Sequence, residues 1–159
     1  DKLFAYVGKV NSLAQPIRGL QNFLFANPLS SFVLKKSLRI AEKRALPKLE
    51  KPLDKNLINN KLTHNTKSVY LYLDEFSNYN ETQIGKDAFA LLEGLGYHVK
   101  FLASTESGRS YISKGFLDEA RACADRNVAL YHGIISEHTP LLGIEPSAIY
   151  TFIDEYPFY

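Results

Sequence analysis

The amino-acid sequence predicts an α/β fold: a three-stranded parallel sheet with flanking helices, preceded by a helical N-terminal segment. Two observations lead to this prediction. Apolar runs of strand length alternate with longer stretches of helical periodicity after residue 67, and a basic, proline-interrupted stretch of helical pattern comes before them. Strands that alternate with helices favour parallel pairing through right-handed crossovers. We therefore expect two units, a basic helical segment with its linker at residues 1–62 and an α/β domain at residues 63–159.

The N-terminal unit has apolar residues at helical spacing, interrupted at Pro16, Pro28 and Pro47. Pro28 directly follows Asn27 and predicts the start of a new helix, since proline suits a first helical turn. An apolar stripe that includes Phe32, Val33, Leu34, Leu38, Ile40 and Ala41 lies opposite Lys35, Lys36, Arg39 and Lys43. Residues 47–65 are rich in lysine, proline and asparagine, which predicts an extended linker.

The C-terminal unit reads as a regular succession of elements. Its runs rich in valine, tyrosine and leucine are typical of buried strands, and Asn80 with Gln83 predicts a capping box at the start of the first helix. We expect that helix to end at Gly94 or Gly96. The predicted elements, in order, are a strand at 68–76, a helix from 80, a strand at 97–104, a helix at 115–136, a strand at 140–146 and a helix from 147.

Composition narrows the class of protein. The 159 residues are 45% hydrophobic and 23% charged, which fits one globular domain or one domain with an accessory segment. No apolar run approaches the roughly 20 residues that span a bilayer, so we expect a cytoplasmic protein, or one peripheral on the inner face of the membrane. The single cysteine, Cys123, excludes an internal disulfide and an all-cysteine metal site. The chain has no methionine, which suggests a piece of a longer polypeptide.

Charge is distributed unevenly. Residues 1–62 hold 12 Lys+Arg and 4 Asp+Glu (+8), and residues 63–159 hold 7 Lys+Arg and 13 Asp+Glu (−6). Two units of opposite sign predict mutual attraction, or a basic segment that meets an acidic partner. The acidic α/β unit gives little support to nucleic-acid binding. A three-stranded sheet also leaves open edges, so we expect partners, including self-association into a homodimer.

Three polar loops follow the predicted strands and should meet at one edge of the sheet, where α/β proteins bind ligands. Their carboxylates are Asp74, Glu75, Glu106 and Glu145. Such a group could bind a hard metal or a small molecule, act in acid–base chemistry, or simply cap helices. The loop at 102–115, "LASTESGRSYISKG", lacks both the Walker and the dinucleotide-binding patterns. The four histidines, His64, His98, His132 and His138, share no ligand-like spacing.

Three motifs in these loops resemble the cysteine-rich (CCG) domain of iron–sulfur oxidoreductases. They read "DEFSNY" at 74–79, "ESGRSYISKGFLDEAR" at 106–121 and "GIEPSAIYTFIDEYP" at 143–157. The resemblance spans residues 69–156 and is strongest to the iron–sulfur part of FAD-linked D-lactate and glycolate dehydrogenases, and to related glycerol-3-phosphate dehydrogenase subunits. It implies half of a CCG-type domain pair, in a parent oxidoreductase that contains FAD and 4Fe–4S clusters and transfers electrons from a 2-hydroxy acid.

The chain departs from the motifs at the family's cysteine positions. Glu75, Glu106, Ser107 and Ala148 stand where the resemblance places cluster-ligating cysteines. Iron–sulfur clusters are held by thiolates, so we expect this domain to bind no cluster or other cofactor and to have no catalytic residue of its own. Glu106 should then be solvent-facing or paired, with Arg109 the nearest candidate, while Ser104 and Ser107 help to close the site. The expected partners are the flavin module, a ferredoxin-like module and the second CCG half of the same polypeptide.

Overall fold

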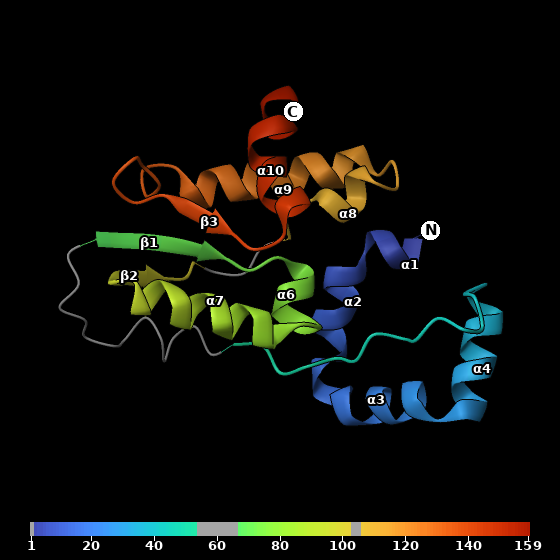
Figure 1. The fold of residues 1–159 in the computed structure, drawn as a ribbon. Helices are drawn as coiled ribbons and strands as arrows, with labels where there is room; N and C mark the ends of the chain where they lie inside the picture. Colours follow the sequence, from blue (N-terminus) through green and yellow to red (C-terminus); the bar gives the residue numbers. More distant parts are fainter. Residues whose placement is uncertain (1, 54–66, 103–105) are drawn as a thin grey trace.

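The computed structural model describes residues 2–53, 67–102 and 106–159 (Figure 1). Its sheet contains β1 (Lys67–Tyr72), β2 (Tyr97–Lys100) and β3 (Leu141–Gly143) in the order β2-β1-β3. Both pairings are parallel, with Val69 opposite Val99 and Leu71 opposite Leu142. The predicted three-stranded parallel α/β fold is confirmed.

The central strand is buried on both faces, as the near-continuous apolar run predicts. On one face Val69, Leu71 and Val99 form a core with side chains of α7 (Thr82–Gly94). On the other face Tyr72 packs with residues of α9 (Leu117–Tyr131) and α10 (Pro146–Asp154). Figure 1 shows α7 on one side of the sheet and these two helices on the other. Each fully buried Val or Leu contributes about 1.5–3 kcal/mol.

The strands and helices are shorter than the sequence pattern predicts. The segment after β1, expected as a loop, contains the short helix α6 (Glu75–Tyr79), and α8 (Arg109–Ile112) lies within the second loop. A 3₁₀ turn, η2 (Tyr156–Phe158), ends the described chain. The helix α7 ends at Gly94, as expected, and Gly96 has a φ of 87°, which glycine adopts without strain.

The predicted capping box at Asn80 is wrong. Helix α7 begins at Thr82, and Asn80 instead ends α6, with its side chain donating to the Lys48 carbonyl and accepting from Asn11. The N-terminal cap comes from a distant residue, Glu50. Its carboxylate accepts hydrogen bonds from the Thr82 amide at 3.0 Å and from the Thr82 hydroxyl at 2.7 Å. Tertiary contact therefore replaces the local cap.

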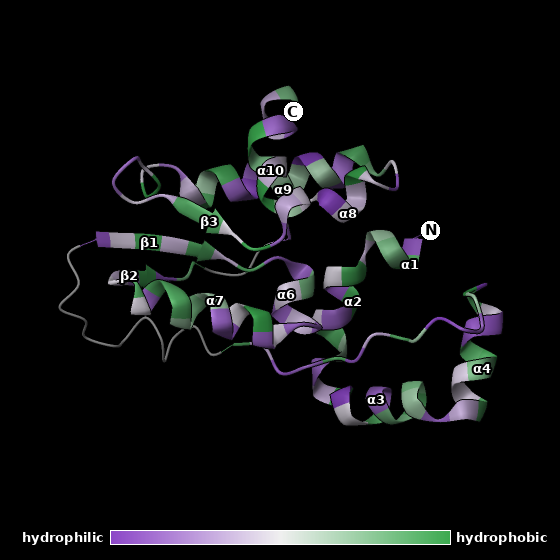
Figure 2. Ribbon diagram, viewed as in Figure 1, coloured by the Kyte–Doolittle hydropathy of each residue, from purple (hydrophilic) through white to green (hydrophobic). Residues whose placement is uncertain are grey.

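The N-terminal segment is helical, as expected. It contains α1 (Lys2–Ala5), α2 (Val7–Ala14), the 3₁₀ turn η1 (Gln15–Ile17), α3 (Arg18–Ala26) and α4 (Pro28–Ser37). Asn27 caps α4 by accepting from the amides of Leu29 and Ser30, so the predicted start at Pro28 is confirmed. The predicted apolar stripe continues to Ala41, whereas α4 ends at Ser37. Figure 2 shows apolar and hydrophilic residues alternating along α3 and α4.

Residues 45–53 run in an extended path between these helices and the sheet. Within the predicted linker, Leu49 is fully buried, and its backbone exchanges two hydrogen bonds of 2.8 Å with the Asn22 side chain. The Glu50 amide donates to the Tyr79 carbonyl. This part of the predicted linker is extended but firmly attached, and residues 54–65 of the prediction lie outside the described residues.

Candidate functional site

The three loops after the strands do meet at one edge of the sheet. A pocket of about 300 Å³ is lined by residues from all three, among them Glu75, Ser107 and Ala148. These side chains are 5%, 0% and 3% exposed respectively. Parallel topology brings them together although they lie far apart in the sequence. Of the four positions where the resemblance places cysteines, these three therefore share one pocket.

Glu75 is the centre of a buried hydrogen-bond network. Its carboxylate accepts from the Ser107 amide at 3.2 Å, from the Ser107 hydroxyl at 3.3 Å and from the Ser110 hydroxyl at 2.9 Å. Burial raises the pKa of Glu75, and the hydrogen bonds from its own amide, Ser107 and Ser110 oppose that rise. The acid of one loop is thus bonded to the serines of another, in the place that the resemblance gives to ligating thiolates.

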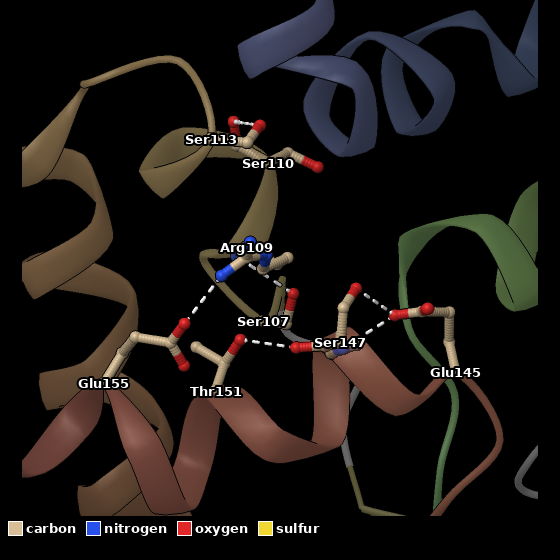
Figure 3. Close-up of polar contacts among 9 residues, drawn as sticks. Ser107, Arg109, Ser110, Ser113, Glu145, Ser147, Thr151 and Glu155 are labelled. Atoms are coloured by element: carbon tan, nitrogen blue, oxygen red, sulfur yellow. Dashed lines mark hydrogen bonds and ion pairs between the residues drawn. The ribbon is translucent and has the colours of Figure 1, made fainter.

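Two of the other predicted carboxylates cap helices. Asp74 is 1% exposed and accepts from the amides of Phe76 and Ser77 at the start of α6. Glu145 accepts from the Ala148 amide and the Ser147 hydroxyl at the start of α10, as Figure 3 shows for Ser147. Burial raises the pKa of Glu145, but these two hydrogen bonds and Arg109 outweigh it, so the pKa is lowered overall. The helix-cap alternative is correct for this pair.

Glu106 lies apart from the serine network. Its Oε2 accepts from the Tyr111 hydroxyl at 3.0 Å, and a Cβ placed on Gly8 of α2 would overlap its Oε1. Glu106 is thus paired, but not with Arg109, the nearest candidate in sequence: Arg109 forms an ion pair with Glu155 at 2.6 Å (Figure 3). The C-terminal helix brings Glu155 to Arg109, a contact that spacing along the chain could not predict. Ser104 lies outside the described residues.

Sequence reasoning missed the buried polar residues that support this loop. The Tyr156 hydroxyl donates to the Ser107 carbonyl at 2.8 Å, and Asn127 Nδ2 donates to Tyr156 Oη and to the Glu106 carbonyl. Asn127 is fully buried, and Tyr156 is 8% exposed. A buried asparagine in a predicted helix has no distinctive single-sequence signal. The motif containing Tyr156 did mark that tyrosine as part of the resemblance.

The donor set does not fit an iron–sulfur cluster. Such a cluster requires about four soft thiolate ligands, whereas these positions offer carboxylate, hydroxyl and methyl groups. Cys123 lies in α9, as predicted, where burial raises the pKa of its thiol to about 11. Within residues 2–53, 67–102 and 106–159, no group of three or more His, Cys, Asp and Glu side chains is arranged to hold a metal ion.

The histidines also occupy separate places. His98 lies on β2, His132 follows the end of α9, and His138 lies in the loop before β3. His64 is outside the described residues.

Over the part of the chain that the structure describes, there is no helix with the length and apolar character needed to cross a bilayer.

Comparison with known proteins finds similarity to dehydrogenases. The chain is 25% identical over 170 residues to a D-2-hydroxyglutarate dehydrogenase of Pantoea ananatis (strain AJ13355), an alignment that covers 98% of this chain and 16% of that protein. It is 32% identical over 84 residues to one of the subunits of the anaerobic glycerol-3-phosphate dehydrogenase of Escherichia coli (strain K12), covering 52% of this chain and 21% of that relative. The chain thus spans about a fifth or less of the length of these relatives.

No protein-family model matches the chain, and no solved structure matches it either. The similarity to two dehydrogenase proteins agrees with the general class that the three motifs indicate. It is a similarity to segments of oxidoreductases.

Proposed function

We propose that this chain is a CCG-type domain of a larger FAD- and iron–sulfur-dependent oxidoreductase that acts on a 2-hydroxy acid. In this proposal the domain binds no cluster, has no catalytic residue of its own, and serves as a scaffold or interaction domain. The support is threefold: the parallel α/β fold, the three motifs at one sheet edge, and the similarity to segments of two dehydrogenases.

The observation that carries the proposal is the hydrogen-bond network of Glu75. In place of thiolates, a carboxylate from one loop accepts hydrogen bonds from Ser107 and Ser110 of another. Such a network satisfies buried polar groups without any ligand, because each side chain finds its partner within the protein. The scaffold around a cluster site would thus persist with polar side chains closing it.

The remaining features of the parent protein follow from the same proposal. Residues 1–62 would connect a ferredoxin-like module to the α/β domain at 63–159, and the flavin module and the second CCG half would lie elsewhere in the polypeptide. The location would be cytoplasmic or peripheral on the inner face of the membrane. The exposed apolar residues of α3 and α4, beside a basic stretch, favour contact with these modules or with a second copy of the chain.

Anaerobic reconstitution with iron and sulfide tests the central point. We expect the wild-type chain to remain colourless and to retain no stoichiometric iron or sulfide, because its donors are not thiolates. The matched control restores the family's cysteines through Glu75→Cys, Glu106→Cys, Ser107→Cys and Ala148→Cys. This variant should gain a cluster, measured by iron and sulfide content and visible absorbance.

Two outcomes contradict the proposal. A stoichiometric cluster in the wild-type chain shows that the substitutions do not abolish ligation. A quadruple variant that is folded by circular dichroism, yet still takes up no cluster, shows that these four positions are not the former ligand sites.

A further inference from the structure

A second pocket, of about 440 Å³, lies between α2, α6, Glu106 and α9. Its floor is buried: Leu73, Asp74, Glu75 and Asn78 line it and are each at most 5% exposed. Its rim is formed by exposed polar side chains, namely Lys9 and Ser12 of α2 and Arg126 of α9. The pocket is therefore a recess with a buried floor and a polar rim, of a size that suits a small molecule.

One buried hydrogen-bond acceptor of the residues that line the floor has no partner. Asn78 is 3% exposed, and its Oδ1 has no hydrogen-bond partner among the described residues, the one side-chain atom of that kind found there. A buried acceptor without a partner is costly and calls for an explanation, such as a ligand that pairs with it. Beside it, Glu106 accepts from Tyr111 through Oε2 and turns Oε1 towards Gly8. A ligand group that meets this floor must donate hydrogen bonds, and a positive charge suits the acids there.

The rim offers the opposite chemistry. The Lys9 ammonium lies over the rings of Tyr6 and Tyr111, at 5.2 and 5.6 Å from their centres. Arg126 Nη2 lies 3.1 Å from the Cys123 sulfur. Neither cation forms an ion pair within the described part of the chain, where the ion pair is the one between Arg109 and Glu155. Two cations at the mouth of the pocket thus remain available to an anionic group.

We propose that this pocket binds a small amino carboxylate, with its ammonium group at Asn78 and Glu106 and its carboxylate at Lys9 and Arg126. A simple anion would meet the carboxylates of the floor, and a simple amine would leave both rim cations unpaired. A zwitterion can pair with both kinds of group, since acids and cations line the same recess. The inference goes beyond the proposed scaffold role and rests on its cluster-free state, because Glu75 and Glu106 line this pocket and are also positions where the resemblance places cluster ligands.

The test is a titration of the ¹⁵N-labelled full chain followed by NMR. The probes are L-alanine, L-leucine, L-glutamate and L-lysine, with two matched controls: 2-hydroxyglutarate replaces the ammonium of glutamate by a hydroxyl, and butylamine lacks a carboxylate. We expect at least one amino acid to give saturable shifts at the amides of Gly8, Asn78 and Arg126. Each control carries charge of one sign only and should bind at least tenfold more weakly than the best amino acid.

Variants locate the site. Asn78→Leu should weaken binding at least tenfold while the melting temperature stays unchanged or rises, because the variant loses an unpaired buried acceptor. Arg126→Gln should also weaken binding, whereas Arg121→Gln on the same helix, outside the pocket, should not. If Asn78→Leu fails to fold, the pair of arginine variants decides.

The proposal is overturned if none of the four amino acids gives saturable shifts, or if 2-hydroxyglutarate binds as tightly as the best of them. Equal binding by Arg126→Gln and Arg121→Gln overturns it as well. Iron and sulfide content reports on the scaffold proposal independently, so the failure of one is distinguishable from the failure of the other.

Discussion

The sheet region and the α3–α4 hairpin are built on different principles. The sheet region has a buried apolar core and a buried polar network: Leu73 is 2% exposed, and Glu75 is bonded to two serines. In α3 none of the described residues is buried, and in α4 the one buried residue is Ser31. Phe23 and Leu29 are 64% and 75% exposed. The sheet region thus has a core of its own, whereas the hairpin leaves apolar and basic side chains exposed.

The two N-terminal helix pairs also differ from each other. Helices α1 and α2 are attached to the α/β region: Ala5 is fully buried against Tyr111 and Ala120, and the Tyr6 hydroxyl donates to Glu119. Figure 1 shows α3 and α4 extending away from the sheet, attached through the Asn22 contact with Leu49. Contact with the α/β region thus weakens along the N-terminal segment, from α1–α2 to α3–α4.

The largest expected difference between the two regions is in the loss of stability when one large apolar side chain of each is replaced by alanine. Leu73→Ala removes a side chain from the sheet core and should destabilise the protein by about 2–5 kcal/mol. Phe23→Ala removes a larger but exposed side chain and should change the free energy of unfolding by no more than about 0.5 kcal/mol. Urea unfolding followed by circular dichroism measures both. Equal losses would show that the hairpin is part of the cooperative core.

An intermediate effect is expected on self-association, which tests whether the exposed hairpin is a contact surface. We expect the wild-type chain to associate at high concentration, through the basic hairpin of one copy and the acidic α/β region of another. Phe23→Ser should weaken this association by about tenfold, equivalent to roughly 1.4 kcal/mol. Raising the salt concentration should weaken it further, since exposed charges are screened.

Sedimentation equilibrium across a concentration series provides the measurement, with Leu91→Ser, on the exposed side of α7, as the control. A strict monomer at high concentration, or equal weakening by the control, would contradict the expectation that the hairpin is the contact surface.

The smallest expected effect is a pH dependence of stability that originates in the sheet region. Burial raises the pKa of Glu75, so the folded protein holds this proton more tightly than the unfolded chain. Its contribution is therefore fully present below the unfolded pKa, about 4.3, and is lost as pH rises through the folded pKa. Glu75→Gln should remove this decrease in the free energy of unfolding with rising pH, while it retains a hydrogen-bonding side chain.

Urea midpoints measured from about pH 4 to pH 8 test this, with Glu81→Gln as the control because Glu81 is exposed. Identical pH profiles for wild type and Glu75→Gln would mean that the carboxyl group is not perturbed by its surroundings.

The sequence pattern predicted strands and helix starts correctly where interactions within one segment determine its structure. The apolar runs at β1, β2 and β3 are strands, and Pro28 after Asn27 starts a helix, because burial and proline geometry act within a few residues. The cap of α7 was mispredicted because the Thr82 amide donates to Glu50, which is far away along the chain, and not to a local side chain.

The sequence alone determined the α/β class, the meeting of three loops at one sheet edge and the lack of thiolates at Glu75, Glu106, Ser107 and Ala148. The first two follow from periodicity, and the third from the residue types at positions that the resemblance to the CCG domain indicates; none of them needs knowledge of distant contacts. Only the tertiary structure decided the partners of the acids: Glu75 with Ser107 and Ser110, Glu106 with Tyr111, and Glu155 with Arg109. The physical reason is range, since a hydrogen bond or ion pair forms only within about 3–4 Å, a separation that is set by how whole elements pack.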